Sequence, residues 1–371
     1  MKRKSLKKIS EVSLSGLTSL KKRVEFLKNL LEVNEADGFF INNLQNVFYL
    51  TGFTGSSGYV LITRNKNYFL TDFRYMLQSK KEVSNLFKIV IIKKFDEIFE
   101  LLKEGKTLLC EKESLTLDLY EELKKKKLKI KPISSPVLDL RVYKNEEEIE
   151  KIRKAQKFSE KVLKKALSIL KPDKTKEIEL ALEIEYEMKR NGFQVAFPTI
   201  VASGKHSALP HAKPRNVTIK NNSILLIDMG SVYKGYHSDM TRTFWVGNNP
   251  PDWFKEIYEI TLNALSMVEE KIKIGMHVRD VDNIARSYIT ERGYGEKFGH
   301  GLGHGVGIEI HEKPSLSPRG KEIIDKGMVF TIEPGIYLEN KGGVRIEDLA
   351  CINKKGELEI LTGFEKRLKK I

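Results

Sequence analysis

Histidine and acidic residues are concentrated in the C-terminal half of this chain. All seven histidines lie between His206 and His311, and the first 205 of the 371 residues contain none. Five residues of this region lie in or beside short apolar runs typical of strands: Asp228, Asp239, His304, Glu333 and Glu347. One neutral nitrogen and four carboxylates suit two divalent cations held side by side better than a single tetrahedral zinc.

The two aspartates belong to a predicted hairpin. An apolar run ends at Asp228, Lys234-Gly235 predicts a turn, and residues 236–246 return as a second strand. We expect this hairpin to bring Asp228 and Asp239 across from each other on one face. Facing carboxylates repel each other unless cations or protons lie between them. The alternative is a capped hairpin stabilised by an ion pair of Arg242.

The segment from His300 to His311 places three histidines among four glycines. Glycine allows the backbone to approach a ligand closely and to adopt conformations that other residues resist. Taken alone, any one of these histidines is compatible with a hydrogen-bonded core residue. Three within twelve residues favour a functional site.

Glu333 and Glu347 each end a run rich in β-branched residues. A buried, unpaired carboxylate is costly, so each position requires a cation, an arginine or a proton. Strand alternation places Arg345 on the same face as Glu347, so a plain Arg345–Glu347 ion pair is the alternative to a metal site.

The surrounding pattern predicts two domains after a basic N-terminal extension of residues 1–14. Residues 15–140 alternate a helix (20–32) with short strands (from Gly38, 59–63 and 68–72), which predicts a small α/β domain. Its glycine-rich segment 49–58 lacks the lysine and spacing of a phosphate-binding loop. In residues 141–371, helices are expected from Asn145 to 169 and over 175–190, 252–273 and 278–292, with strands after Pro198. Helices over a mainly antiparallel sheet, an α+β class, follow.

Composition limits the functional class. Hydrophobic residues make up 40% and charged residues 31% of the chain, as in soluble globular proteins. We expect a cytoplasmic protein, because no apolar run approaches the roughly 18 residues of a membrane span and no signal peptide is evident. The net charge of +15, densest at Lys124–Lys127, is assigned to solvated surface rather than to nucleic-acid binding, since no aromatic residues interleave the basic ones. Cys110 and Cys351 are expected to be buried reduced thiols.

Together these segments resemble the pita-bread-fold metallopeptidases, a family that includes methionine aminopeptidase, Xaa-Pro aminopeptidase and Xaa-Pro dipeptidase. The motifs are specific as a set and occur in the family's order. They are Ala202-Ser-Gly-Lys-His-Ser-Ala-Leu-Pro-His211, the Asp228/Asp239 hairpin, His300-Gly-Leu-Gly-His304, Thr331-Ile-Glu333-Pro-Gly and Arg345-Ile-Glu347-Asp. Residues 46–56 and 71–75 are similar to the creatinase/prolidase N-terminal domain. The resemblance implies a pita-bread catalytic domain, with helices over a curved, mainly antiparallel sheet, after a smaller α/β domain.

The same resemblance implies a dinuclear site, usually manganese or cobalt, with Fe²⁺ or Zn²⁺ also compatible. By motif match, Asp228 chelates one metal, His304 and Glu333 the other, and Asp239 and Glu347 bridge both. A metal-bound water would attack the peptide carbonyl, with Glu333 as proton carrier and His211 and His311 contacting substrate. The match adds His300 and Arg345 to the substrate-binding residues. His206 departs from the family's usual asparagine.

We therefore expect a homodimeric Xaa-Pro aminopeptidase that removes a residue preceding proline. An Xaa-Pro dipeptidase is the alternative, and the sequence does not separate the two. Creatinase-like chemistry without metal and a non-enzymatic binding module are disfavoured because all five ligand positions are filled. Methionine aminopeptidase is disfavoured because it typically lacks the N-terminal domain.

Overall fold

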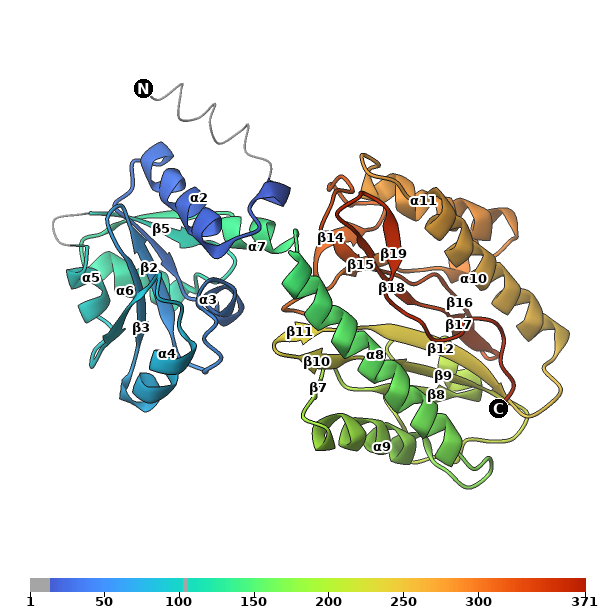
Figure 1. The fold of residues 1–371 in the computed structure, drawn as a ribbon. Coiled ribbons are helices and arrows are strands. Elements are labelled where there is room, and N and C mark those ends of the chain that lie inside the picture. The colour runs from blue at the N-terminus through green and yellow to red at the C-terminus, as the bar shows by residue number, and fades with distance from the viewer. Residues whose placement is uncertain (1–13, 103–105) are drawn as a thin grey trace. The chain divides into compact units, whose positions relative to one another are not determined.

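The chain folds into two compact units, residues Met1–Tyr143 and Lys144–Ile371, in a computed structural model that describes residues 14–102 and 106–371 (Figure 1). The division lies three residues after the boundary predicted at 140/141. The predicted basic extension, residues 1–14, falls outside the described residues except for Leu14. No helix in the described ranges combines the length and apolar character needed to span a membrane.

The N-terminal unit is built on a mixed sheet with strand order β4-β3-β2-β1-β5-β6. The central strand β1 is the apolar segment Gly38–Ile41, buried throughout, antiparallel to β2 and parallel to β5. The other strands are β2 (Tyr59–Thr63), β3 (Asn67–Thr71), β4 (Lys88–Ile91), β5 (Thr107–Glu111) and β6 (Lys129–Ile133). The helices are α2 (Leu20–Val33), α3 (Leu44–Thr51), α4 (Met76–Glu82), α5 (Glu97–Glu100), α6 (Leu117–Lys125) and α7 (Pro136–Arg141). The predicted α/β character is confirmed.

Four long helices of the C-terminal unit match the predicted ones closely. Helix α8 spans Glu146–Ile169 and begins with a capping box: Asn145 Oδ1 accepts from the Glu148 amide, and the Glu148 carboxylate accepts from the Asn145 amide. Helix α9 spans Glu177–Arg190, two residues later than the predicted start at 175. The remaining two are α10 (Asp252–Lys271) and α11 (Val278–Glu291).

The strands of this unit form antiparallel sheets. One has the order β12-β9-β8 and the largest has the order β14-β13-β15-β18-β19, while β11-β10-β7 and β16-β17 form smaller ones. Their bounds are β7 Gln194–Val195, β8 Ile200–Ser203, β9 Ser223–Met229, β10 Ser231–Tyr233, β11 Tyr236–His237, β12 Met240–Val246, β13 Gly303–Gly305, β14 Glu312–Leu316, β15 Val329–Ile332, β16 Gly335–Leu338, β17 Gly342–Arg345, β18 Asp348–Ile352 and β19 Leu358–Ile360. The α+β class is thereby confirmed.

Each of the two helix pairs packs on a different set of strands. Helices α8 and α9 pack on the half that contains β7 to β11, and α10 and α11 pack against one another and on β14, β16 and β17 (Figure 1). Buried side chains from α8, α9, β9 and β12, such as Leu163, Ile184, Ile227 and Phe244, form one apolar core. This core fixes β9 and β12, at whose ends Asp228 and Asp239 lie.

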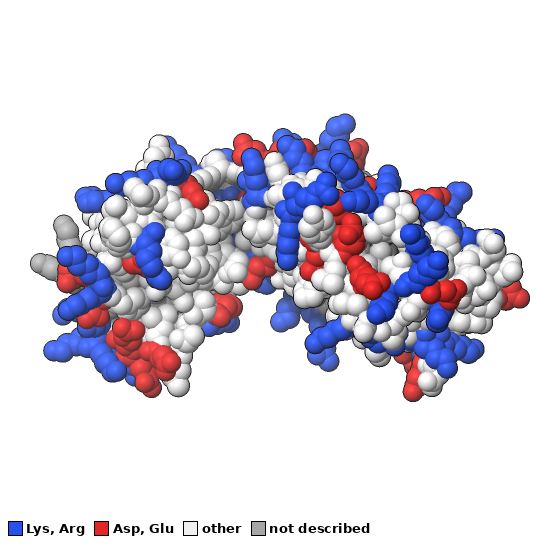
Figure 2. Space-filling model, turned by 90° about the horizontal axis from the view of Figure 1, so that it is seen from below, with Lys and Arg blue, Asp and Glu red and all other residues white. Residues whose placement is uncertain are grey.

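The surface charges are intermixed, and both cysteines are buried. On the face seen in Figure 2, Lys and Arg side chains are scattered among acidic and uncharged residues instead of forming one continuous basic strip. Cys110 and Cys351 are free and buried, as predicted.

Candidate metal centre

The predicted aspartate hairpin is present, but its register differs from the expectation. Strands β9 and β12 pair so that Asp228 lies opposite Thr241, and Asp239 immediately precedes β12. Asp239 is therefore two residues away from the position facing Asp228. Because side chains alternate with a period of two, both aspartates still belong to one face. The turn forms at Lys234-Gly235, where both residues have positive φ, at 48° and 81°.

His304 lies on β13, and the strands on both sides of β13 approach it closely. A Cβ on Gly303 would lie 2.0 Å from the carbonyl oxygen of Thr331, and a Cβ on Gly305 would lie 2.1 Å from that of Lys313. Only glycine permits strands this close together on both sides of the imidazole. His304 Nδ1 lies 3.1 Å from the Gly305 carbonyl oxygen. In the tautomer that donates this bond, Nε2 presents its lone pair to the carboxylates, as metal-ligating histidines do.

The two glutamates enter from neighbouring strand ends. Glu333 follows β15, and Glu347 lies between β17 and β18. The Thr241 hydroxyl donates to Glu347 Oε2 over 2.6 Å, and the Thr331 hydroxyl donates to Glu333 Oε1 over 3.3 Å. Each carboxylate is thus oriented by a threonine, with its remaining oxygen free to meet another group.

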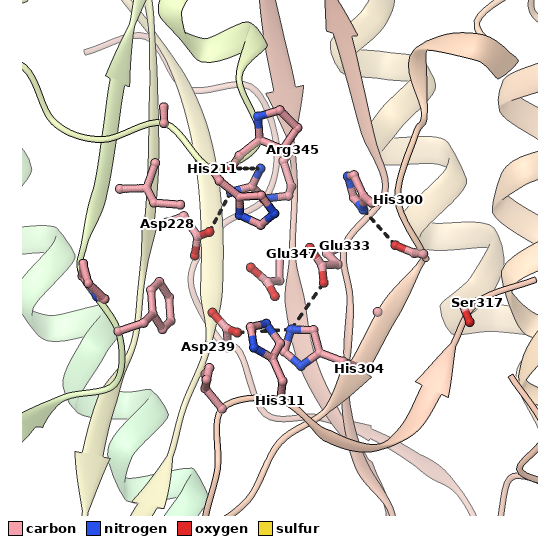
Figure 3. Close-up of a pocket in the computed structure, with 18 of the residues that line it drawn as sticks. His211, Asp228, Asp239, His300, His304, His311, Ser317, Glu333, Arg345 and Glu347 are labelled. Carbon is pink, nitrogen blue, oxygen red and sulfur yellow. Dashed lines mark hydrogen bonds and ion pairs between the residues drawn. The ribbon is translucent and has the colours of Figure 1, made fainter. Parts of the chain in front are cut away.

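All five expected ligands converge on one cavity (Figure 3). His304 Nε2 lies 3.6 Å from Asp239 Oδ2 and 3.5 Å from Glu333 Oε1. Asp239, His304 and Glu347 each offer one atom, and these atoms lie within 4.8 Å of one another. The sequence placed these residue types in one region, and the fold brings their side chains together.

Burial and mutual repulsion shift the titration of the cluster. Burial, followed by the charge of Glu347, raises the pKa of Asp239 well above its ordinary value. Burial, followed by the charge of Glu333, does the same for Glu347, and burial raises the pKa of Glu333 to about 8. Burial, followed by the nearby His311, lowers the pKa of His304 to about 4, so its ring is neutral near pH 7. Without cations, burial therefore favours the protonated forms of Asp239, Glu333 and Glu347, and a bound metal would displace these protons.

The donor set fits a pair of divalent cations. Within the described residues, Asp228 Oδ1 and Asp239 Oδ1 are buried and have no hydrogen-bond partner. Carboxylate oxygens without a partner are costly in a protein interior. An oxygen-rich set with one imidazole is suited to Mn²⁺ or Co²⁺ and admits Fe²⁺ or Zn²⁺.

The Arg345–Glu347 ion pair, considered as the alternative to a metal site, is absent among the described residues. Arg345 instead donates from Nη2 to Asp228 Oδ2 over 2.6 Å, and its Nε donates to the Thr241 hydroxyl over 3.1 Å. Its Nη1 donates to the Tyr337 hydroxyl over 2.8 Å and to the Pro210 carbonyl oxygen over 3.3 Å. The guanidinium is therefore engaged on every nitrogen by the protein itself.

The hairpin ion pair considered for Arg242 is also absent among the described residues. Arg242 Nη2 donates to Asp348 Oδ1 over 2.6 Å, and its Nη1 donates to the backbone carbonyl oxygen of Glu347 over 2.6 Å. Successive side chains of a strand point to opposite faces, so Arg242 points away from the cavity that Thr241 faces. Arg242 therefore fixes the backbone of Glu347 from the face opposite the cavity.

Three of the remaining histidines line the same cavity: His211, His300 and His311. His300 Nε2 lies 3.0 Å from the Tyr337 hydroxyl oxygen, and His300 Nδ1 lies 2.8 Å from the Gly301 carbonyl oxygen. The His311 ring packs edge-on against the His304 ring at a centroid distance of 4.3 Å. Burial, followed by His211, lowers the pKa of His311, and burial lowers that of His300 to about 4.

The structure adds residues that the sequence pattern missed. The cavity of about 490 Å³ is also lined by four apolar residues, Phe197, Pro198, Ile200 and Ile310. Thr241 could have been found from the hairpin register, since it faces Asp228. No local signal marked Tyr337, which joins His300 to Arg345.

The C-terminal unit matches the model of metallopeptidase family M24 over residues 150–354, and residues 23–143 match the creatinase/prolidase N-terminal domain. The chain belongs to metallopeptidase family M24.

Similar proteins share both units of this M24 chain. The Xaa-Pro dipeptidase of Pyrococcus furiosus is 41% identical over 354 residues, covering 94% of this chain and 100% of the relative. Among solved structures, an Xaa-Pro dipeptidase from Bacillus anthracis has a TM-score of 0.91 at 37% identity, covering 95% of this chain and 100% of that one. An X-Pro aminopeptidase from Thermotoga maritima has a TM-score of 0.83 at 36% identity, covering 91% and 98%.

Proposed function

We propose that this M24 peptidase is an Xaa-Pro dipeptidase that uses two divalent metal ions. The observation that carries the proposal is the cavity that is lined by four carboxylates, by the His304 imidazole between two of them and by four apolar residues. Two relatives that are 41% identical over 94% of this chain bear the name Xaa-Pro dipeptidase. These relatives favour the dipeptidase over the aminopeptidase, which was the first expectation from sequence.

The proposed ligand set divides between the two metals. Asp228 would chelate one ion, His304 and Glu333 the other, and Asp239 and Glu347 would lie between them. The unpartnered Oδ1 atoms of both aspartates support this arrangement. Bound there, the ions would supply a water of lowered pKa and an electrophile for the scissile carbonyl oxygen.

The protein's own groups would then orient the substrate and move protons. Glu333 is placed to take the proton of the attacking water and return it to the leaving nitrogen. His311, neutral near pH 7 because burial lowers its pKa, can donate a hydrogen bond to the developing oxyanion. His211 lines the same cavity and is assigned to the substrate backbone.

His300 and Arg345 are assigned supporting roles in substrate binding. Both contact the Tyr337 hydroxyl, and Arg345 also contacts the carbonyl oxygen of Pro210, the residue before His211. We propose that they act on substrate by holding the cavity wall and Asp228 in place, because four of the five N–H groups of Arg345 donate to the protein.

We propose that selectivity for proline comes from the apolar residues that line the cavity. The rings of Phe197 and Pro198 and the side chains of Ile200 and Ile310 offer a surface on which a pyrrolidine ring can pack. The amide before proline has no N–H, so a dry apolar surface leaves no donor unsatisfied there.

We also propose manganese as the resident metal, a homodimer as the assembly and the cytoplasm as the location. The oxygen-rich ligand set supports manganese. Phe73 and Leu77 on the N-terminal unit, 76% and 68% exposed, support an additional contact surface. Metal analysis after reconstitution, sedimentation velocity and cell fractionation test the three points separately.

The activity is tested with Ala-Pro, Ala-Pro-Ala and Met-Ala-Ser under identical metal conditions. We expect Ala-Pro to be cleaved with the highest kcat/KM. Comparable cleavage of Ala-Pro-Ala would change the assignment to an Xaa-Pro aminopeptidase. Preference for Met-Ala-Ser would overturn the Xaa-Pro assignment altogether.

A further inference from the structure

The ring of His211 is placed in the cavity by the backbone of the segment that carries it. His211 lies on residues 204–214, here called the His211 loop, which joins β8 to a segment beside the start of α9. Its exposed side chain lines the cavity (Figure 3), and its ring makes no hydrogen bond within residues 14–102 and 106–371. The position of this ring therefore depends on how the His211 loop is held.

One buried carboxylate joins the two ends of the His211 loop. Glu177, the first residue of α9, is 0% exposed. Its Oε1 accepts from the amide and the hydroxyl of Ser203 over 2.8 and 2.7 Å, and from Arg215 Nη2 over 2.8 Å. Its Oε2 accepts from the amide and from Nε of Arg215 over 2.9 and 3.0 Å. Ser203 precedes the loop and Arg215 follows it, so two residues 12 positions apart meet at a single side chain.

The Glu177 carboxylate carries its charge despite its burial. Burial opposes ionisation, but hydrogen bonds from Arg215 and Ser203 hold the pKa of Glu177 below its ordinary value. Its place in the first turn of α9 also favours negative charge. The five hydrogen bonds that it accepts are therefore charge-assisted, and such bonds are about twice as strong as neutral ones.

The two ends of the loop belong to different parts of the C-terminal unit. Ser203 is the last residue of β8 and pairs with Leu225 of β9, so this end is part of the sheet. The Arg215 carbonyl oxygen accepts from the Ile178 amide over 3.1 Å, so the other end follows α9. The Glu177 side chain therefore fixes the distance between the sheet and the helix across the loop.

His211 lies close to the end that Glu177 holds. Before it, the carbonyl oxygen of Pro210 accepts from Arg345 Nη1 over 3.3 Å. After it, the next hydrogen bonds to another segment, among the described residues, are those of Arg215, four positions further on. A shift of Arg215 is thus transmitted to His211 over a short stretch of chain. Glu177 itself does not line the cavity, so any effect that it has on the reaction is indirect.

Resting on the proposed substrate contact of His211, we propose that Glu177 is a positioning residue for substrate binding. By joining Ser203 to Arg215, its carboxylate fixes the His211 loop and thereby the imidazole that meets the substrate backbone. Glu177 touches neither the substrate nor the five proposed metal ligands.

Glu177→Gln tests this assignment in the manganese-loaded full-length protein. Glutamine has one acceptor oxygen in place of two, so it can hold the Ser203 end or the Arg215 amide but not both. We expect KM for Ala-Pro to rise about 10-fold, the effect of one weakened hydrogen bond to the substrate, with kcat within about 2-fold of wild type. The Kd for manganese should also stay within about 2-fold, because no proposed ligand lies on the His211 loop.

A double-mutant cycle distinguishes positioning from a general loss of structure. If Glu177 acts through His211, Glu177→Gln should change KM by less than about 2-fold in the His211→Ala protein, whereas a merely structural role would give the same factor in both backgrounds. Glu187→Gln is the matched control. Glu187 also lies on α9, its side chain is 10% exposed, and it pairs with Lys165 and Arg190 outside the loop, so its loss should leave KM unchanged.

Hydrogen exchange measures the hold on the loop without any substrate. Because the amides of Ser203 and Arg215 donate to Glu177, Glu177→Gln should accelerate exchange over residues 203–215 by about 10-fold and leave β12 unchanged. If Glu177→Gln does not fold, Arg215→Met takes its place. Its side chain is 44% exposed, and loss of its Nε and Nη2 donors should raise KM by about 3-fold.

Four results would overturn the assignment of Glu177: equal KM factors in both backgrounds, a loss confined to kcat, a matching fall in manganese affinity, or unchanged exchange over residues 203–215. Failure of the wild type to cleave Ala-Pro would instead count against the proposed Xaa-Pro activity. The exchange measurement would then still decide whether Glu177 holds the His211 loop.

Discussion

The buried pair between Arg345 and Asp228 gives the sharpest test of how the metal site is held. The two side chains are 4% and 13% exposed, and Nη2 lies 2.6 Å from Oδ2. Arg345→Met removes the charge while retaining much of the side-chain volume. Asp228 is then left as a buried carboxylate without its arginine partner. The Thr241 and Tyr337 hydroxyls each lose the hydrogen bond from Arg345, while Tyr337 keeps its contact with His300.

Breaking a buried ion pair by removing one partner costs about 3–5 kcal/mol in the free energy of unfolding. For a unit of about 150–250 residues, each kcal/mol shifts Tm by about 2–4 °C, so the metal-free C-terminal unit should lose about 6–20 °C. The measurement is made in EDTA, because a bound cation would otherwise neutralise Asp228 in place of the arginine.

A double-mutant cycle assigns the loss to the pair. We expect Asp228→Asn and Arg345→Met together to cost less than the sum of the single variants, with a coupling energy of about 2–3 kcal/mol in urea unfolding. Arg153→Met is the control. Its ion pair with Glu359 is partly exposed, at 23% and 37%, and such pairs contribute at most about 1 kcal/mol. Strict additivity in the cycle, or equal losses from Arg345→Met and Arg153→Met, would refute the reasoning.

Three further outcomes are expected. Manganese at about 100 times its Kd should increase the free energy of unfolding of the wild type by about 2.7 kcal/mol. Asp239→Asn should abolish this gain, as measured by thermal unfolding. Retention of the full gain would remove Asp239 from the ligand set. His304→Ala should abolish turnover while far-UV circular dichroism stays unchanged, and near-normal activity would exclude it as a ligand. Burial, followed by the charge of Asp348, raises the pKa of Glu269 from 4.5 to about 7. The folded state therefore holds this proton more tightly than the unfolded state, and the stability it contributes is lost as pH rises from about 4.5 through 7. Glu269→Gln should lack this decline in urea unfolding, and an unchanged pH profile would contradict the assignment.

The sequence by itself determined the local features, because each depends on residues close together along the chain. Asn145 and Glu148 are three positions apart, so the capping box that begins α8 could be read directly. Lys234-Gly235 marked its turn because a tight hairpin requires positive φ, which glycine adopts easily. The identities of the five expected ligands also came from the sequence, since acidic residues at the ends of apolar runs need partners wherever the runs pack.

The tertiary structure decided which residues meet. The exact hairpin register, with Thr241 rather than Asp239 opposite Asp228, depends on strand pairing that a two-residue side-chain period leaves open. Arg345 pairs with Asp228, 117 positions away, rather than with its neighbour Glu347, and Thr241 reaches Glu347 across 106 positions. Phe197, His300 and Ile310 share a cavity only because separate segments converge on it. Strand alternation predicted the face of the sheet to which the Arg345 side chain points. Whether Arg345 pairs with Asp228 or with Glu347 on that face depended on how distant strands pack together.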